Sequence, residues 1–329
     1  MSVEKIGPIE IIMGETKSKV PFSTSLLLGG ENESVLIDCG GGRDAFAYLT
    51  QKDISTIYLT HYHLDHIWGA HLFPNANVSI NPYDLKKICN PYELAKASGQ
   101  YALYGKEKAQ RQVEHQCHQS RNDELKPRWG PVINIADDCY AYDQPIEVAG
   151  TTMTMLHTPG HTEGFCCPYF PEYGVLFVGD YDLTSFGPWY NDADSDINDF
   201  IASAKRTLET DAEYFVTAHH KGSFSRQAYQ ERLQQYIDKI YEREEKTKQA
   251  VQRGVQPKDI VYEEIFYFRK NHRQNRHYLG SEILGIAKHI ERLIAQGYDF
   301  VDYFEQFRSH FHLDIDFLDY RSQPDCKML

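Results

Sequence analysis

The 329-residue sequence lacks the long apolar runs of a membrane protein, since none approaches the roughly 18 residues that a spanning helix needs. Its start has no basic stretch followed by an apolar one, so we expect no signal peptide. Basic residues are few: 34 lysines and arginines stand against 47 acidic residues, a net charge of -13. We therefore expect neither nucleic acid nor membrane as partner, because both favour a basic surface.

The sequence also lacks a disulfide pattern. Its seven cysteines are scattered, odd in number and without a CxxC pair. This usage favours a reduced compartment, and we expect a cytoplasmic protein. Cys166 and Cys167 lie near His161 and offer soft metal ligands, but free cysteines usually pack as small apolar groups. We therefore expect these two to pack in a strand.

Histidine is concentrated in one short stretch, Thr60 to Gly69, which reads THYHLDHIWG. Three histidines and one aspartate fall within residues 61–66, directly after an apolar segment (54–60) typical of a buried strand. A strand would alternate these side chains across two faces, whereas an irregular loop can bring them together. Imidazole and carboxylate are the usual ligands of zinc and, in related sites, of iron or manganese. The stretch therefore predicts a metal site.

Three later segments have a similar form, each near the end of an expected strand. They are Thr158 to Gly164 (TPGHTEG), Phe177 to Asp180 (FVGD) and Phe215 to His220 (FVTAHH). Together with the first stretch they resemble, in order, the four metal motifs of the metallo-β-lactamase superfamily. The resemblance covers roughly residues 6 to 222. It implies an α+β fold, an αββα sandwich, and a metal-dependent hydrolase.

The resemblance also implies a ligand set with two divalent metal ions. Zinc is the metal favoured, with iron or manganese as alternatives. Adjacent residues at a strand end point in opposite directions, so only one of His219 and His220 is a ligand; we choose His219. Asp38, before three glycines, either supports the ligand loop or is an ordinary turn residue. One metal would be held by His61, His63 and His161, the other by Asp65, His66 and His219, and Asp180 would bridge them.

Such a pair of metals lowers the pKa of a shared water to near 7, giving a bridging hydroxide that attacks the substrate. Asp65 is positioned in sequence to move a proton to the leaving group, and Tyr181 is a candidate oxyanion donor. We expect a small ester, thioester or lactone as substrate. The alternatives are a one-iron dioxygenase acting on a sulfur substrate and a phosphodiesterase or nuclease. The 39 positions from Asp180 to His219 are too few for an inserted nuclease domain.

Strands are predicted over Ile6 to Met13, Ser25 to Leu28, Ser34 to Asp38, Asn77 to Ile80, Val132 to Ala136, Ile146 to Val148, Thr151 to Met155, Phe165 to Phe170, Val175 to Val178 and Tyr214 to Thr217. Helices are predicted over Arg43 to Gln51, Ile67 to Phe73 and Asp196 to Leu208. These elements belong to a catalytic domain over residues 1–222. Its pattern of strands followed by strands and helices, occurring twice, suits two sheets packed face to face.

Residues 82–130 are polar and helical in pattern, with interspersed aromatic residues, and we expect an insertion that forms a lid over the site. His115 and His118 within it are expected on a solvated face. Residues 223–329 form a helical extension, which leaves a homodimer through these helices open. One apolar stripe joins Tyr229, Leu233, Tyr236, Ile237, Ile240 and Tyr241; a second joins Ile283, Ile286, Ala287, Ile290, Leu293 and Ile294, with Ser281 as its N-cap and Gly297 at its end.

Overall fold

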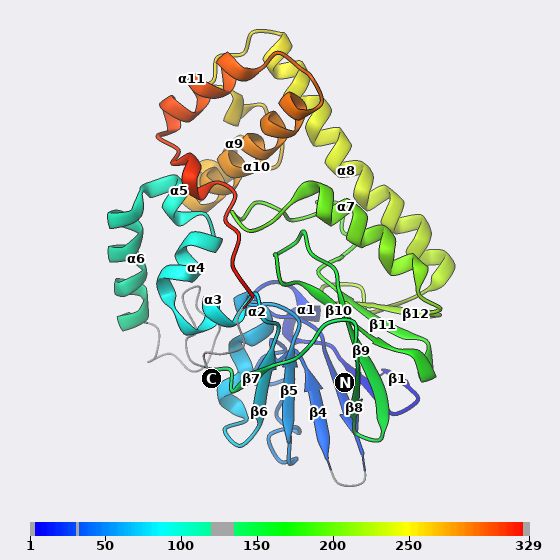
Figure 1. The fold of residues 1–329 in the computed structure, drawn as a ribbon. Coiled ribbons are helices and arrows are strands. Elements are labelled where there is room, and N and C mark those ends of the chain that lie inside the picture. The colour runs from blue at the N-terminus through cyan, green and yellow to red at the C-terminus, as the bar shows by residue number, and fades with distance from the viewer. Residues whose placement is uncertain (1–3, 31–32, 120–134, 325–329) are drawn as a thin grey trace.

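The computed structural model describes residues 4–30, 33–119 and 135–324. Two β-sheets pack face to face, with helices outside both of them and the C-terminal helices above them in the view of Figure 1. Alternation along β3 (Ser25–Gly29) explains the layers, because Leu26 and Leu28 face the other sheet while Leu27 faces the helical side. Burial on both faces accounts for the nearly continuous apolar strands. The α+β sandwich that the sequence predicted is confirmed.

The first sheet has strand order β1-β2-β3-β4-β5-β6-β7. Its first four strands are antiparallel, and β4 to β7 are parallel. Of the strand predicted over 6–13, residues 9–12 form β2, but the predicted start is too early, because Gly7 turns at a φ of 57° and the chain forms a hairpin there. The strands are β1 Glu4–Ile6, β2 Ile9–Ile12, β3 Ser25–Gly29, β4 Ser34–Ile37, β5 Thr56–Leu59, β6 Asn77–Ile80 and β7 Asp138–Cys139.

The second sheet has strand order β13-β12-β11-β10-β9-β8, and only β11 and β12 are parallel. Since parallel strands end at the same edge of a sheet, the loops after β11 and β12 begin side by side. The same holds for the loops after β4 and β5 in the first sheet. The strands are β8 Pro145–Val148, β9 Thr151–His157, β10 Cys166–Phe170, β11 Val175–Gly179, β12 Tyr214–Thr217 and β13 Ser223–Ser225.

Two further elements predicted within residues 1–222 differ from the structure. Residues 43–51 form successive turns in place of a regular helix. Of the strand predicted over Val132 to Ala136, residues 132–134 lie outside the described chain, and residues 135 and 136 are not in a strand. The other short elements of this region are α1 Glu15–Ser18, α2 Leu64–Ile67, η1 Trp68–Leu72, η3 Pro171–Tyr173, α7 Ile197–Arg206 and η4 Thr207–Glu209.

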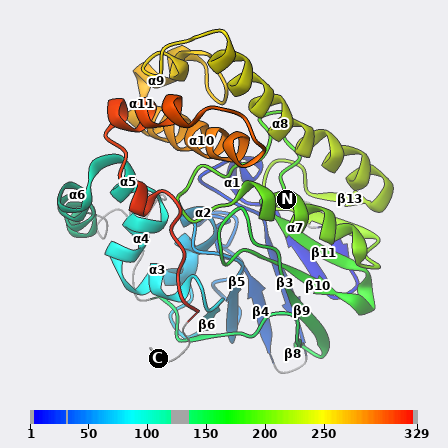
Figure 2. The same cartoon turned by 45° about the horizontal axis from the view of Figure 1, so that its top comes forward.

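The described part of the insertion is helical, as predicted. Its helices are α3 Leu85–Cys89, α4 Pro91–Ala97, α5 Gln100–Tyr104 and α6 Lys106–Gln119. They lie beside the first sheet and reach up toward the C-terminal helices (Figures 1 and 2). Asn90 caps α4 by accepting a hydrogen bond from the backbone of Tyr92, with Pro91 at the first helical position.

The C-terminal region contains the 27-residue helix α8 (Arg226–Gln252), η5 (Ile260–Tyr262), α9 (Arg269–Gln274), α10 (Arg276–Ala295), α11 (Val301–Phe311) and η6 (Ile315–Phe317). The apolar stripe predicted on α8 is buried within the chain, except for the exposed Tyr241. Ser281 is not an N-cap: α10 starts five residues earlier because Asn275 caps it. No helix in the described ranges is both long and apolar enough to cross a membrane.

After α11 the chain returns toward the β-sheets as an extended tail, which Figure 2 shows running past α4 and α3. The backbone N–H of Asp314 donates to Ala102, and that of Tyr320 donates to Ala193. Ser322 donates through both its N–H and its hydroxyl to the carboxylate of Glu163. The tail therefore ties the insertion to the loops that follow β9 and β11.

Candidate metal centre

The first ligand loop begins where β5 ends. His61 comes two residues after the end of the strand, His63 is the N-cap of α2, and Asp65 and His66 lie in that helix. The loop packs closely against the segment after β4, where a Cβ on Gly40 would lie 1.4 Å from the carbonyl oxygen of Asp65. This glycine therefore permits the close approach of the two segments.

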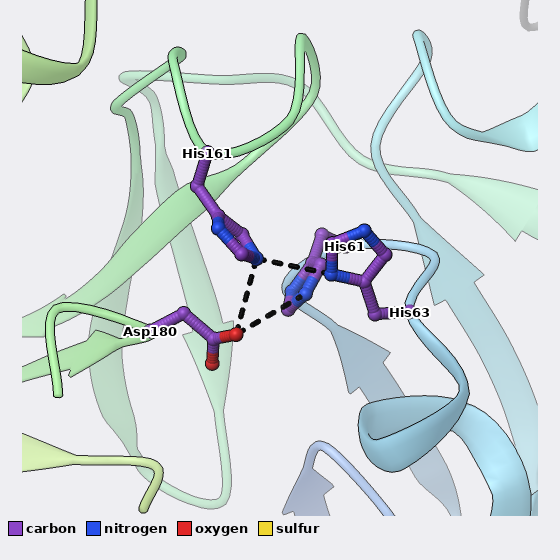
Figure 3. A group of neighbouring side chains, drawn as sticks. All are labelled: His61, His63, His161 and Asp180. Atoms are coloured by element: carbon purple, nitrogen blue, oxygen red, sulfur yellow. Dashed lines mark hydrogen bonds and ion pairs between the residues drawn. The ribbon is translucent and has the colours of Figure 1, made fainter. Parts of the chain in front are cut away.

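Four side chains form a first donor group: His61, His63, His161 and Asp180, with ligand atoms within 4.8 Å of one another (Figure 3). Nε2 of His161 lies 3.0 Å from Nδ1 of His63 and 3.1 Å from Oδ2 of Asp180. Nε2 of His61 is 3.9 Å from the same Asp180 oxygen. The three imidazoles thus present one nitrogen each, with a carboxylate oxygen, to one small volume.

A second donor group consists of Asp65, His66 and His219. Its histidines approach the other oxygen of Asp180: Oδ1 lies 2.9 Å from Nε2 of His66 and 3.5 Å from Nε2 of His219. Asp65 Oδ2 is 3.5 Å from Nε2 of His219. The carboxylate of Asp180 therefore lies between the two groups, with one oxygen directed to each.

Both groups are supported from behind through the other ring nitrogen of each histidine. Asp38 accepts from the backbone and hydroxyl of Thr60 and lies 2.6 Å from Nδ1 of His66, which confirms its supporting role. Such outer partners fix the ring orientation and tautomer of a ligating histidine. The remaining pairs are His61 Nδ1 with the Thr60 hydroxyl, His63 Nε2 with Asp192, His161 Nδ1 with the carbonyl of Trp189, and His219 Nδ1 with the carbonyls of Ser18 and Phe22.

In the described chain, the inward-facing Nε2 atoms of His61 and His219 are buried without a hydrogen-bond partner, and Nε2 of His66 lies 2.9 Å from Oδ1 of Asp180. A buried, unpaired polar atom is costly, so such a cluster of acceptors needs a compensating charge. Imidazole nitrogen and carboxylate oxygen are suitable donors for a divalent cation. The residues therefore fit the metal that the sequence predicted.

Without a metal, protons provide that charge. Burial alone would lower the pKa of His66, but Asp180 and Asp38 raise it well above its usual range. His219 behaves similarly: burial opposes its charge, and Asp182 and Asp180 raise its pKa to about 10. Burial would raise the pKa of Asp180, but His66, His161 and His219 hold it well below its usual range. Metal binding would replace these protons.

The structure brings together all seven residues that the sequence selected as metal ligands. His219 is buried in the second group, whereas its neighbour His220 is exposed at a φ of 63°. Cys166 and Cys167 are buried outside both groups and pack in β10, as predicted. His115 is exposed on α6, as predicted, and the side chain of His118 lies outside the described set.

Tyr181 was predicted as an oxyanion donor, and the structure places it elsewhere. Its side chain is fully buried against Phe165 and Phe200, and its hydroxyl donates to the carbonyl of Thr158 at 3.4 Å. Burial raises its pKa well above the usual range. The residue is part of the core, and we assign it no catalytic role.

Sequence reasoning missed two aspartates of the loop that follows β11. Asp182 joins Asp180 and His219 in a further set of close donor atoms, and burial raises its pKa to about 8. Asp192 lies 3.0 Å from His63. For Asp192 the only signal is the acidic run DADSD at 192–196, and for Asp182 it is a position two residues after Asp180.

The loop over residues 180–196 also connects the site to the helices around it. On one side, Asp194 pairs with the fully buried Lys87 of α3 at 2.6 Å and accepts from the hydroxyl of Tyr62. On the other side, the side chain of Asn191 donates to the carbonyl of Ser281 in α10. Helices from the insertion and from the C-terminal region thus hold the same loop.

Comparison with known proteins agrees with this fold and site. The sequence matches the family model of the metallo-beta-lactamase superfamily over residues 19–219. An atrochrysone carboxyl ACP thioesterase from Passalora fulva is 24% identical over 234 residues, or 66% of this chain and 55% of that protein. The chain thus spans little more than half the length of that relative.

Two solved structures have a similar fold. A metallo-beta-lactamase family protein from Thermus thermophilus is 19% identical with a TM-score of 0.57, covering 88% of this chain and 94% of that one. A beta-lactamase domain protein from Burkholderia ambifaria is 14% identical with a TM-score of 0.58, covering 89% and 88%. The chain belongs to the metallo-beta-lactamase superfamily.

Proposed function

We propose that the protein is a dinuclear metal-dependent hydrolase of a small thioester. The observation that carries the two-metal assignment is the position of Asp180, which directs one carboxylate oxygen to each donor group. His61, His63 and His161 would hold one ion, Asp65, His66 and His219 the other, and Asp180 both. Zinc is the ion we favour, with iron or manganese as alternatives.

The ions, when bound, supply activated water at neutral pH and polarise the substrate carbonyl. The chain's own residues orient and protect this chemistry. Asp192 and the Trp189 carbonyl fix two imidazoles of the first group. Asp38 fixes the imidazole of His66 in the second group. Asp65, itself a member of the second group, is 6% exposed, and its carboxylate can transfer a proton to the leaving group.

Two considerations favour a thioester over the other substrates. The curated relative is named a thioesterase, although it matches over only part of its length. The chain from Asp180 to His219 contains only a loop, α7, η4 and β12, so this stretch holds no inserted nuclease domain. Oxyesters and lactones remain the related substrates to test.

The test is to load the purified full chain separately with zinc, iron or manganese and to count metal per chain. Each form is then assayed on a thioester, an oxyester, a lactone and a phosphodiester. We expect two ions per chain, thioester turnover above the rest, and loss of turnover with a chelator. One ion per chain, with oxygen consumption on a persulfide, would instead indicate the dioxygenase. Preferred cleavage of the phosphodiester would overturn the thioester assignment.

A further inference from the structure

A continuous set of aromatic rings extends from the loop over residues 180–196 to the C-terminal helices. The ring of Phe186 lies 5.4 Å from that of Tyr267, and Tyr267 lies 4.9 Å from Tyr278. Tyr278 is 6.1 Å from His277, which stacks on Trp189 with an interplanar angle of 22°. We call these five residues the aromatic wall.

The wall reaches the first donor group. The carbonyl of Trp189 holds His161, and three residues further on Asp192 holds His63. Because the ring of Trp189 lies against that of His277, the same residue joins α10 to a histidine of the first donor group.

The wall is accessible, unlike the aromatic residues behind the site. His277 and Phe186 are exposed, and Trp189, Tyr267 and Tyr278 are partly exposed. Tyr181 and Tyr190, from the same loop, are fully buried and belong to the core. Aromatic faces left accessible beside a reaction centre suit the apolar part of a ligand.

Buried charges hold both sides of the wall in place. The guanidinium of Arg243 donates to the carbonyls of Phe186 and Pro188 and stacks on the Phe186 ring at 4.9 Å. On the other side, the carboxylate of Glu282 accepts from three successive backbone N–H groups, including that of Tyr267 at 2.8 Å. The rings are thus fixed before a ligand binds, which is what a selective binding surface requires.

We propose that the aromatic wall binds the acyl group of the substrate and selects planar aromatic acyl groups over aliphatic ones. This inference rests on the proposed hydrolase function and specifies its substrate class. Rings of Trp and His bind a flat aromatic group by stacking, whereas an aliphatic chain gains only the burial of its surface.

The kinetic test compares S-benzoyl and S-butanoyl N-acetylcysteamine with the metal-loaded full chain. Trp189→Ala and His277→Ala should each raise KM for the benzoyl substrate about tenfold, with kcat changed less. The butanoyl KM should change much less. Trp189→Phe and His277→Phe keep a ring and should restore most of the preference. Tyr214→Ala, an exposed aromatic at the opposite end of β12, serves as the matched control and should match the wild type.

A binding test separates this inference from the proposed function. Calorimetry measures the affinity of 2-naphthoate and of hexanoate for the same metal-loaded variants, without hydrolysis. We expect the alanine variants to weaken naphthoate at least fivefold and hexanoate less. Unchanged naphthoate binding, or equal losses of affinity for both ligands, would contradict the proposed selection of aromatic groups by the aromatic wall. Selective naphthoate binding without any thioester turnover would support aromatic binding by the wall and contradict the hydrolase proposal.

Discussion

The two donor groups on either side of Asp180 are built alike but supported differently. The second group is held by the first part of the chain: Asp38 supports His66, and the carbonyls of Ser18 and Phe22 support His219. These histidines are almost fully buried. Because its supports precede the insertion, this group depends little on the helices that surround the site.

The first group depends on the loop over residues 180–196. Asp192 and the Trp189 carbonyl hold His63 and His161, and the side chain of His63 is 16% exposed. That loop in turn packs between α3 and α10. The difference indicates that the insertion and the C-terminal helices act on one half of the metal centre, the half nearer the aromatic wall.

Replacing Asp180, which the two donor groups share, should disable both groups together and so have the largest effect on turnover. We expect Asp180→Ala to lower turnover at least about 1,000-fold, or roughly 4 kcal/mol, because both ions lose a ligand at once. Turnover, metal per chain and circular dichroism check this. Asp238→Ala, on the exposed side of α8, should behave as the wild type. Near-normal turnover in Asp180→Ala would show that the carboxylate is not shared.

Replacing the carboxylates that support the ligating histidines from behind should affect the metal affinities of the two donor groups differently. Asp192→Asn loosens only His63 and should weaken one ion by about 10–100-fold while leaving the other unchanged. Asp38→Asn should weaken both ions, because Asp38 contacts His66 directly and His61 through Thr60. Asparagine also tolerates the φ of 55° at position 38.

Stepwise metal titration of the metal-free protein, followed by calorimetry, measures both affinities. Asp143→Asn, at a surface ion pair with Arg206, is the control and should leave the two affinities unchanged. If Asp192→Asn weakened both ions equally, the two groups would not be independently supported.

The seven donor residues were predictable because each follows a strand end in a short motif. Their convergence follows from parallel strands that end at one edge, a local pattern that sequence carries. The outer partner Asp192 was not predictable, because its role depends on how residues 180–196 fold against α3 and α10. The oxyanion role predicted for Tyr181 was wrong for the same reason, because its proximity to Asp180 in sequence did not reveal that the ring packs in the core.

Helix boundaries were predicted less well than strand positions. Residues 43–51 have a helical composition but only form turns, because packing under the first sheet decided the backbone there. Ser281 looked like an N-cap, yet α10 continues through it from Asn275. Apolar periodicity located the buried faces of α8 and α10, since burial follows the period directly. The domain limits, the lid role of 82–130 and a dimer through 223–329 remain predictions.

The smallest expected effect is the pH dependence of stability in the metal-free protein, which arises from protons bound at the second donor group. His219 has a folded pKa of about 10 against about 6.5 when unfolded, so the folded state binds more protons between those values. The contribution of His219 to the free energy of unfolding is therefore fully present below about pH 6.5, and it is lost as the pH rises toward 10. Asp182, with a pKa raised to about 8, acts in the same direction up to that pH. The depressed pKa of Asp180 opposes this only in the acid range, where its ordinary pKa lies.

We expect the Tm of the chelator-treated protein to fall by about 3 °C or more from pH 6.5 to pH 9, at constant ionic strength. The Tm gained on adding two equivalents of metal should grow over the same range, because bound metal replaces those protons. His219→Gln should flatten the metal-free profile, whereas the exposed His310→Gln should not. A metal-free Tm that rises with pH would contradict the protonated cluster. Equal flattening by both variants would place the titrating groups outside the second donor group.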